Sequence, residues 1–298
     1  MASDFQIVIS ASRRTDIPAF YMPWFMERIE TGVFEVRNPY TNHINRIPAK
    51  AGPVHTIVFW SKDFNTFLWE RYGEKLRGKG YHLFFNFTIN SEDKILEPNL
   101  PPLANRLQQL TRLCEQFGPD SIQWRFDPVC HYQDSAGAVF DNLHAFDLIS
   151  EAAATLGVRR CVTSFMDPYR KVLRRAAIDA SNIRFIEPSL GEKVAIVSRL
   201  QARLEKLSMQ LLVCCEKEVL SALPEGKPVV AGACIPNDYL MALHGGRLRL
   251  QKDRGQRHSA GCGCMISTDI GSYELHPCHH RCLYCYANPS DGRIPARE

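Results

Sequence analysis

The chain has 298 residues, a formal net charge of +4 and a hydrophobic content of 45%. This composition excludes an intrinsically disordered or collagen-like chain, and no apolar run approaches the roughly 20 residues that cross a bilayer. The opening residues, MASDFQIVIS, lack the basic and apolar regions of a signal peptide. We therefore expect a cytoplasmic protein with no membrane partner. Its mild, scattered positive charge allows nucleic acid as a partner but does not require it.

Short runs of β-branched and aromatic residues alternate with longer amphipathic segments along the first 234 residues. The runs predict strands buried on both faces of a parallel sheet, at residues 6–11, 55–60, 81–88, 122–126, 160–165, 210–215 and 228–234. Between them, helices are predicted at residues 102–117, 138–156 and 190–207, and the first two are stopped by Gly118 and Gly157. Alternating strands and helices predict an α/β fold. We expect a single (β/α) barrel, complete or incomplete, with a doubly wound sheet as the second choice.

The sequence changes character at residue 243. Residues 1–243 are predicted to form the barrel-like domain, and residues 244–298 a cysteine-rich, metal-binding tail packed on the mouth of the barrel. Five of the eleven cysteines lie in this tail, at Cys262, Cys264, Cys278, Cys282 and Cys285. Because the cytosol is reducing and disfavours disulfides, such clustering predicts a metal site.

Three of the tail cysteines have a diagnostic spacing. Cys278, Cys282 and Cys285 form C-x3-C-x2-C, with Tyr284 directly before the third cysteine. Three thiolates so arranged can bind three irons of a 4Fe-4S cluster and leave the fourth iron open. The alternative is a zinc site built from cysteines and histidines of the tail. Zinc modules more often use paired C-x2-C hooks, so the spacing favours the cluster. The tail histidines at positions 276, 279 and 280 are expected to be exposed.

The triad resembles the cysteine motif of the radical S-adenosylmethionine superfamily. The wider chain resembles a bacterial family known as domain of unknown function 1848, through ISASRRTDIPAFY (9–21), IVFWSKD (57–63), WRFDP (124–128), CGCMISTDIGSY (262–273) and CLYCYANP (282–289). The superfamily resemblance implies that the open iron binds S-adenosyl-L-methionine. An electron from the cluster, which an external donor must reduce, then cleaves the sulfonium and generates an adenosyl radical that modifies the substrate. The resemblance to the domain family supplies no reaction.

Charged residues follow the predicted strands. In (β/α) barrels the active site lies at the C-terminal ends of the strands, so Arg13, Asp16, Lys62, Arg125 and Asp127 are candidate catalytic residues. Candidate cofactor contacts are Arg14, Arg257 and Tyr284, because arginine can bind the cofactor's carboxylate in a bidentate manner. The alternative is internal pairing, such as Arg14 with Asp16 and Arg125 with Asp127.

Cys262 and Cys264 form a C-x-C hook that could join Cys234 in binding a second metal or cluster; the alternative is that these are buried, reduced thiols. For the whole chain, the main hypothesis is a radical enzyme acting on a polar or anionic small molecule or peptide, with a nucleic acid substrate left open. Two alternatives are a non-enzymatic zinc or cluster module that binds nucleic acid or protein, and an electron carrier.

Overall fold

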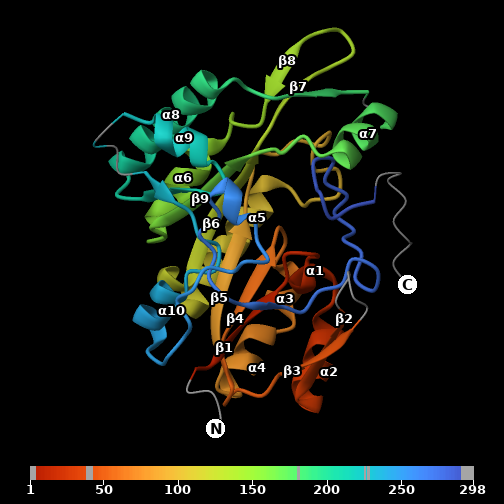
Figure 1. Cartoon of the computed structure of the whole chain (residues 1–298), viewed down its shortest axis with the longest axis vertical. Helices are drawn as coiled ribbons and strands as arrows, with labels where there is room; N and C mark the ends of the chain where they lie inside the picture. The colour runs from red at the N-terminus through yellow and green to blue at the C-terminus, as the bar shows by residue number, and fades with distance from the viewer. Residues whose placement is uncertain (1–4, 38–42, 180–181, 225, 227–228, 290–298) are drawn as a thin grey trace.

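A parallel β-sheet runs through the molecule (Figure 1). The computed structural model describes residues 5–37, 43–179, 182–224, 226 and 229–289. Within this part of the chain the sheet has eight strands, in the order β12 (Val230–Ala231), β11 (Gln210–Val213), β9 (Arg160–Phe165), β6 (Ile122–Val129), β5 (His82–Thr88), β4 (Val54–Ser61), β1 (Ile7–Ala11) and β13 (Thr268–Asp269). All but β13 correspond to predicted strands. Pro228, where the last of these was predicted to begin, lies outside the described residues.

Helices and two small antiparallel sheets complete the fold. The helices are α1 (Ile17–Phe20), α2 (Met22–Thr31), α3 (Asn65–Trp69), α4 (Tyr72–Gly78), α5 (Leu103–Phe117), α6 (Phe146–Thr155), α7 (Arg170–Ile178), α8 (Leu190–Lys206), α9 (Lys217–Ala222) and α10 (Asn237–His244), with short 3-10 turns at Pro119–Ser121 and His258–Ala260. One small sheet pairs β2 (Val33–Arg37) with β3 (Ile44–Pro48), and the other has the order β10 (Arg184–Ile186), β7 (His131–Gln133), β8 (Val139–Asp141). The predicted helix at 138–156 is therefore wrong in its first part, because Val139–Asp141 pairs with β7.

The two faces of the large sheet pack against different parts of the chain. Side chains alternate along a strand, so Phe59 of β4 joins the apolar cluster formed with the helices α2, α3, α5, α6 and α8. Val58 and Trp60 of the same strand point to the other face, where they pack with Leu240 of α10 and with Cys262 of the tail. The second face is thus covered by the C-terminal part of the chain.

The prediction of a single (β/α) barrel is wrong, because the sheet does not close. A barrel needs a continuous ladder between its first and last strands. Here the free edge of β1 pairs instead with β13 from the tail, and β12 at the other edge has only two residues. Between the two edges the tail makes single backbone bonds, from Gly263 N to Gly232 O (3.1 Å) and from Met265 N to Ile235 O (3.0 Å). The tail therefore lies between the β12 edge and the β13 edge of the sheet, which would pair directly with each other in a closed barrel.

The last described part of the tail passes between α1 and α7, where it is drawn in dark blue (Figure 1). Because the tail also contributes β13, it is part of the large sheet as well as a cover for it. The proposed domain boundary at residue 243 stays a prediction, and residues 290–298 lie outside the described residues. Among the described helices, none is long and apolar enough to cross a membrane.

Three histidines pack together at the N-terminal ends of β4 and β5. His82 stacks on His244 of α10 with a centroid distance of 4.4 Å, and His55 Nε2 lies 2.7 Å from the carbonyl oxygen of Gly245. Burial and the neighbouring His82 and His55 lower the pKa of His244 to about 4. Its buried Nε2 has no hydrogen-bond partner among the described residues. The folded protein therefore favours the neutral form of His244.

Stability should consequently fall as the pH drops below about 6.5. The ordinary histidine pKa of 6.5 applies to the unfolded chain, so between about pH 6.5 and 4 the unfolded state binds the extra proton. We expect His244 to contribute a loss of about 1–2 kcal/mol in unfolding free energy over this interval, because its half-buried ring is partly solvated. His244→Phe should flatten this pH dependence in urea unfolding, whereas His144→Phe at an exposed position should not. An unchanged profile for His244→Phe would contradict the assignment.

Candidate functional site

A cavity of about 600 Å³ lies at the C-terminal ends of the strands of the large sheet. Its wall includes all the residues predicted for the site: Arg13, Arg14, Asp16, Lys62, Arg125, Asp127, Cys234, Arg257, Cys262, Cys264, Cys278, Cys282, Tyr284 and Cys285. The fold thus brings together segments as far apart in the sequence as residues 13 and 285. The cavity wall also includes Trp60, Cys214 and Cys215, which were not predicted as site residues.

The cysteine loop, residues 278–285, forms one side of this cavity. Its three cysteines are free thiols, and Cys282 is buried. Burial and the nearby charges of Cys285 and Asp16 raise the pKa of Cys278. The three sulfur atoms do not all lie within 4.8 Å of one another, whereas sulfurs around one tetrahedral zinc ion lie about 3.8 Å apart.

The backbone of the cysteine loop is held by Arg175, a buried residue of α7. Its Nη2 donates to the carbonyl oxygens of Leu283 (2.6 Å) and Cys285 (2.7 Å). Its Nη1 donates to the carbonyl oxygens of Asn288 (3.2 Å) and Pro289 (3.0 Å). Sequence reasoning missed this residue. The helical spacing of Arg175 with the apolar Val172 could have indicated its burial, but not its partners.

Asp16 ties the same loop to the first strand. Its Oδ1 accepts from the backbone nitrogen of Ala19 (3.0 Å) and caps α1. Its Oδ2 accepts from the hydroxyl of Ser61 (2.9 Å) and the backbone nitrogen of Lys62 (2.9 Å), and lies 2.8 Å from His280 Nε2. Asp16 is therefore occupied as a positioning residue. The expectation that the tail histidines are exposed is wrong. His280 is 1% exposed because it packs on Asp16, His276 is 7% exposed, and His279 is half-buried.

Lys62 and Tyr284 meet at a buried carboxylate that the sequence did not single out. Lys62 Nζ lies 2.8 Å from Glu97 Oε1, and the Tyr284 hydroxyl donates to the same oxygen. Arg106 lies 3.6 Å from Glu97 Oε2. Burial raises the pKa of Glu97, but Lys62 and Arg106 outweigh it and lower that pKa overall. The ionised Glu97 thus links the second predicted strand to the cysteine loop.

The arginines of the cavity differ in their partners. Arg125 pairs with Asp127, as the internal-pairing alternative predicted, and Arg257 pairs with Asp167. The predicted pair of Arg14 with Asp16 is wrong. Arg14 instead lies 4.0 Å from Asp269, because the carboxylate oxygens of Asp16 are already engaged.

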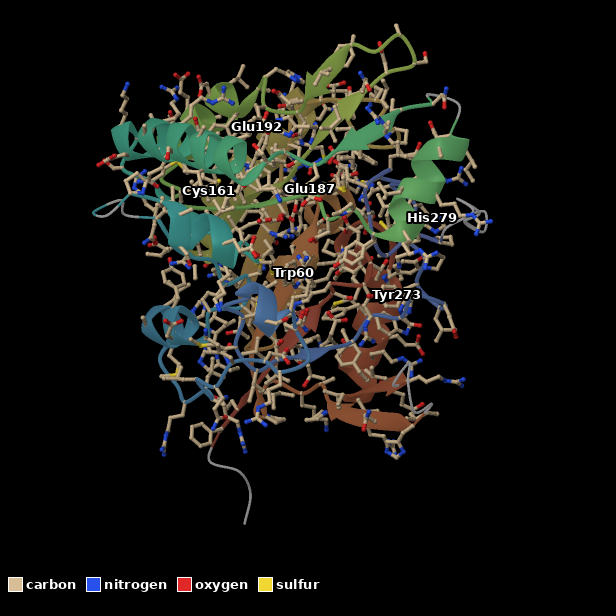
Figure 2. All side chains as sticks on the ribbon, turned by 45° about the horizontal axis from the view of Figure 1, so that its top comes forward. Trp60, Cys161, Glu187, Glu192, Tyr273 and His279 are labelled. Carbon is tan, nitrogen blue, oxygen red and sulfur yellow. The ribbon has the colours of Figure 1, made fainter. Side chains whose placement is uncertain are left out.

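Arg13 has a different environment from these paired arginines. Both of its terminal nitrogens lie 3.3 Å from the hydroxyl of Ser267, and it forms no salt bridge with a carboxylate of the described residues. The guanidinium groups of Arg13 and Arg125 lie 5.2 Å and 4.9 Å from the ring of Trp60. Trp60 lies in the middle of the molecule, with Tyr273 and His279 of the tail on one side of it (Figure 2).

A second cysteine group lines the same cavity. We define it as Cys214, Cys215, Cys234, Cys262 and Cys264. The sulfur atoms of Cys214, Cys215 and Cys262 all lie within 4.8 Å of one another. The predicted set of Cys234, Cys262 and Cys264 therefore lacked Cys214 and Cys215. The adjacent cysteine pair at the end of the predicted strand 210–215 was the signal that could have found them.

Comparison with known families is consistent with the extent of this site. The family described as "Domain of unknown function (DUF1848)" matches residues 8–287. The chain belongs to this family. The DUF1848 match runs from β1 to just beyond the cysteine loop, so it includes both cysteine groups and every charged residue of the cavity discussed above. Among curated proteins, none matches the chain.

Removing the Arg175 side chain should loosen the cysteine loop of this DUF1848 protein. Arg175→Met keeps the apolar stem but leaves buried carbonyl groups without donors, at a cost of about 1–3 kcal/mol for each group that water cannot reach. We expect lower stability in urea unfolding and faster proteolysis of the tail. Arg174→Met, at an exposed neighbouring position, is the matched control. Equal stability and proteolysis in the two variants would show that Arg175 does not hold the loop.

Proposed function

We propose that this DUF1848 protein is a radical S-adenosylmethionine enzyme whose 4Fe-4S cluster is bound by Cys278, Cys282 and Cys285. The observation that carries the proposal is the placement of three free thiols with C-x3-C-x2-C spacing on one loop that lines a large cavity. When bound, the cluster and S-adenosylmethionine would supply one-electron chemistry, namely sulfonium cleavage and hydrogen abstraction. An external electron donor is needed to reduce the cluster.

The cavity supports an enzyme over the two alternative functions. Its volume of about 600 Å³ lies within the usual range for small-molecule sites, which is about 300–1,000 Å³. An electron carrier has no need of such a space beside its cluster. Zinc modules more often use paired C-x2-C hooks, whereas the cysteine loop contains one, formed by Cys282 and Cys285.

Arg13 is the residue best suited to bind the carboxylate of S-adenosylmethionine. Arg125 and Arg257 each have a carboxylate partner, and so does Lys62. Arg13 has a hydroxyl partner and no salt bridge within the described residues. The charges of Asp269, Cys264 and Cys234 act on this guanidinium, but no carboxylate oxygen of the described residues lies within 4.0 Å of it. An incoming anion would therefore be bound favourably at Arg13, as the cofactor or as an anionic substrate.

The other charged residues would shape the pocket and contact the substrate. Asp127 accepts a hydrogen bond from Ser164 as well as pairing with Arg125, so its carboxylate has a defined orientation. Lys62 is held between Glu97 and the ring of Tyr284, 5.5 Å from the ring centroid. Such a pocket suits a polar or anionic small molecule or peptide.

A cytoplasmic location stays a prediction.

The cluster can be tested directly. Protein purified anaerobically should contain a 4Fe-4S cluster, and after reduction it should cleave S-adenosylmethionine to 5′-deoxyadenosine. Changing Cys278, Cys282 and Cys285 together to Ala should abolish both the electron paramagnetic resonance signal of this reduced cluster and the cleavage. Cys114→Ala, at a buried cysteine on α5, should retain both. A triple variant that keeps the same cluster would refute the ligand assignment.

Cofactor affinity should depend on Arg13. If its ion pair with the cofactor's carboxylate is fully buried, Arg13→Ala should lose about 2–5 kcal/mol of binding free energy, or roughly 30-fold and more in affinity. Its melting temperature should change little, because Arg13 forms no internal salt bridge to lose. Arg14→Ala is the control, since its guanidinium already donates to the carbonyl oxygen of Gly271. Parent-like binding of Arg13→Ala in anaerobic calorimetry would exclude this role.

A further inference from the structure

The second cysteine group gathers three separate parts of the chain at one point. Cys214 and Cys215 follow β11, Cys234 follows β12, and Cys262 and Cys264 belong to the tail. The Sγ atoms of Cys214 and Cys215 are 3.5 Å apart, and the backbone nitrogen of Cys234 donates to the Cys264 sulfur at 3.3 Å. Such a convergence of thiols is not required by strand pairing, since β11 and β12 pair through residues that precede these cysteines.

We propose that the second cysteine group binds a metal of its own, with Cys214, Cys215 and Cys262 as ligands. Thiolates select soft ions such as zinc and iron. Because three of these sulfurs lie within 4.8 Å of one another, the spacing suits a single tetrahedral ion, whose sulfur ligands lie about 3.8 Å apart. This site goes beyond the proposed function, which uses only the cysteine loop.

The backbone around the group is shaped to bring the sulfurs together. A Cβ atom on Gly263, between the two tail cysteines, would lie 2.7 Å from the carbonyl oxygen of Gly232. Only glycine allows the tail to approach the end of β12 so closely. Cys215 has a φ of 62°, a left-handed conformation that costs about 1–3 kcal/mol in a non-glycine residue and is common at functional sites. The close approach at Gly263 and the left-handed backbone at Cys215 therefore place cysteine side chains near one another, and neither adds a residue to the strand pairing.

Cationic side chains lie beside the second cysteine group, because Arg13, Arg125 and Arg257 line the same cavity. The deprotonated thiolate is the form that binds metal. The guanidinium groups of Arg13 and Arg125 both interact with the charge of Cys234. These two cations would therefore offset the negative charge of a metal ion bound by thiolates.

The metal would connect the tail to the end of β11, near the edge of the open sheet. It would therefore complete the cavity wall beside Arg13 without taking part in binding at the cysteine loop. Its loss should affect the attachment of residues 262–264, while the 4Fe-4S cluster of the cysteine loop should remain.

The test is metal analysis of the full chain purified anaerobically, in two backgrounds. In the variant with Cys278, Cys282 and Cys285 changed to Ala, metal bound to the second group should remain, as one zinc or as iron. In the otherwise intact chain, Cys214→Ser/Cys262→Ser should lose that metal, lower the melting temperature and still show the signal of the cysteine-loop cluster. Cys114→Ser, at a buried cysteine elsewhere, should retain all the metal.

The two metals give distinguishable results, and each supports the site. Zinc in the triple variant identifies a single-ion centre, and chelated protein should then regain its melting temperature with added Zn²⁺. Iron in the triple variant identifies a second iron centre. The proposal would be overturned if the triple variant contained no metal and the parent contained only the iron of the cysteine-loop cluster. Full retention of metal in Cys214→Ser/Cys262→Ser would overturn it as well. Neither result depends on cleavage of S-adenosylmethionine, so failure of the proposed function would be seen separately.

Discussion

The carboxylate of Asp269 attaches the tail to the first strand, and the rest of the site depends on this attachment. It accepts hydrogen bonds from the hydroxyls of Ser10 and Ser12, both at 2.8 Å, and from the backbone nitrogen of Arg13 at 2.7 Å. These bonds extend the parallel pairing of β13 with β1. A Cβ on Gly271 would lie 2.1 Å from the Ser12 hydroxyl oxygen, so the chain must have glycine where it leaves this contact. These contacts fix the backbone of Arg13 and the point from which residues 272–289, including the cysteine loop, begin.

Beyond this point the tail is held both by buried polar groups and by an apolar cluster, in which Cys282, Leu283 and Tyr284 pack with residues of α7 and of the small sheet of β10, β7 and β8. Arg175 binds backbone carbonyls of the loop, Asp16 binds His280, and Glu97 binds Tyr284. Each buried group is expensive to leave without a partner, so these contacts specify one position for the loop. They also explain why several charged side chains at the cavity have structural partners. Arg13, with a hydroxyl partner, differs from them and remains suited to a ligand.

The two cysteine groups have different geometries although they line one cavity. The cysteine loop has its three cysteines on one short segment. The second group combines cysteines that follow β11 and β12 with cysteines of the tail, and the sulfurs of Cys214, Cys215 and Cys262 are close together. A centre of the second kind can exist only when the tail is docked, because its ligands are distant in sequence. Metal binding and folding would therefore be coupled there.

The sequence by itself determined the strands of the sheet and the cysteine loop. Apolar runs such as residues 55–60 become strands because both faces of a parallel sheet are buried, and the C-x3-C-x2-C spacing is a local property of one segment. The charged strand ends, including Arg13 and Lys62, were also predictable, since parallel strands end at the same edge. Only the tertiary structure decided that the sheet stays open, because strand closure is a long-range event and β13 occupies the edge of β1. It alone brought Arg175 and Glu97 to the loop, and Cys214 and Cys215 to Cys262. These contacts join residues whose local sequence carries no record of their distant partners.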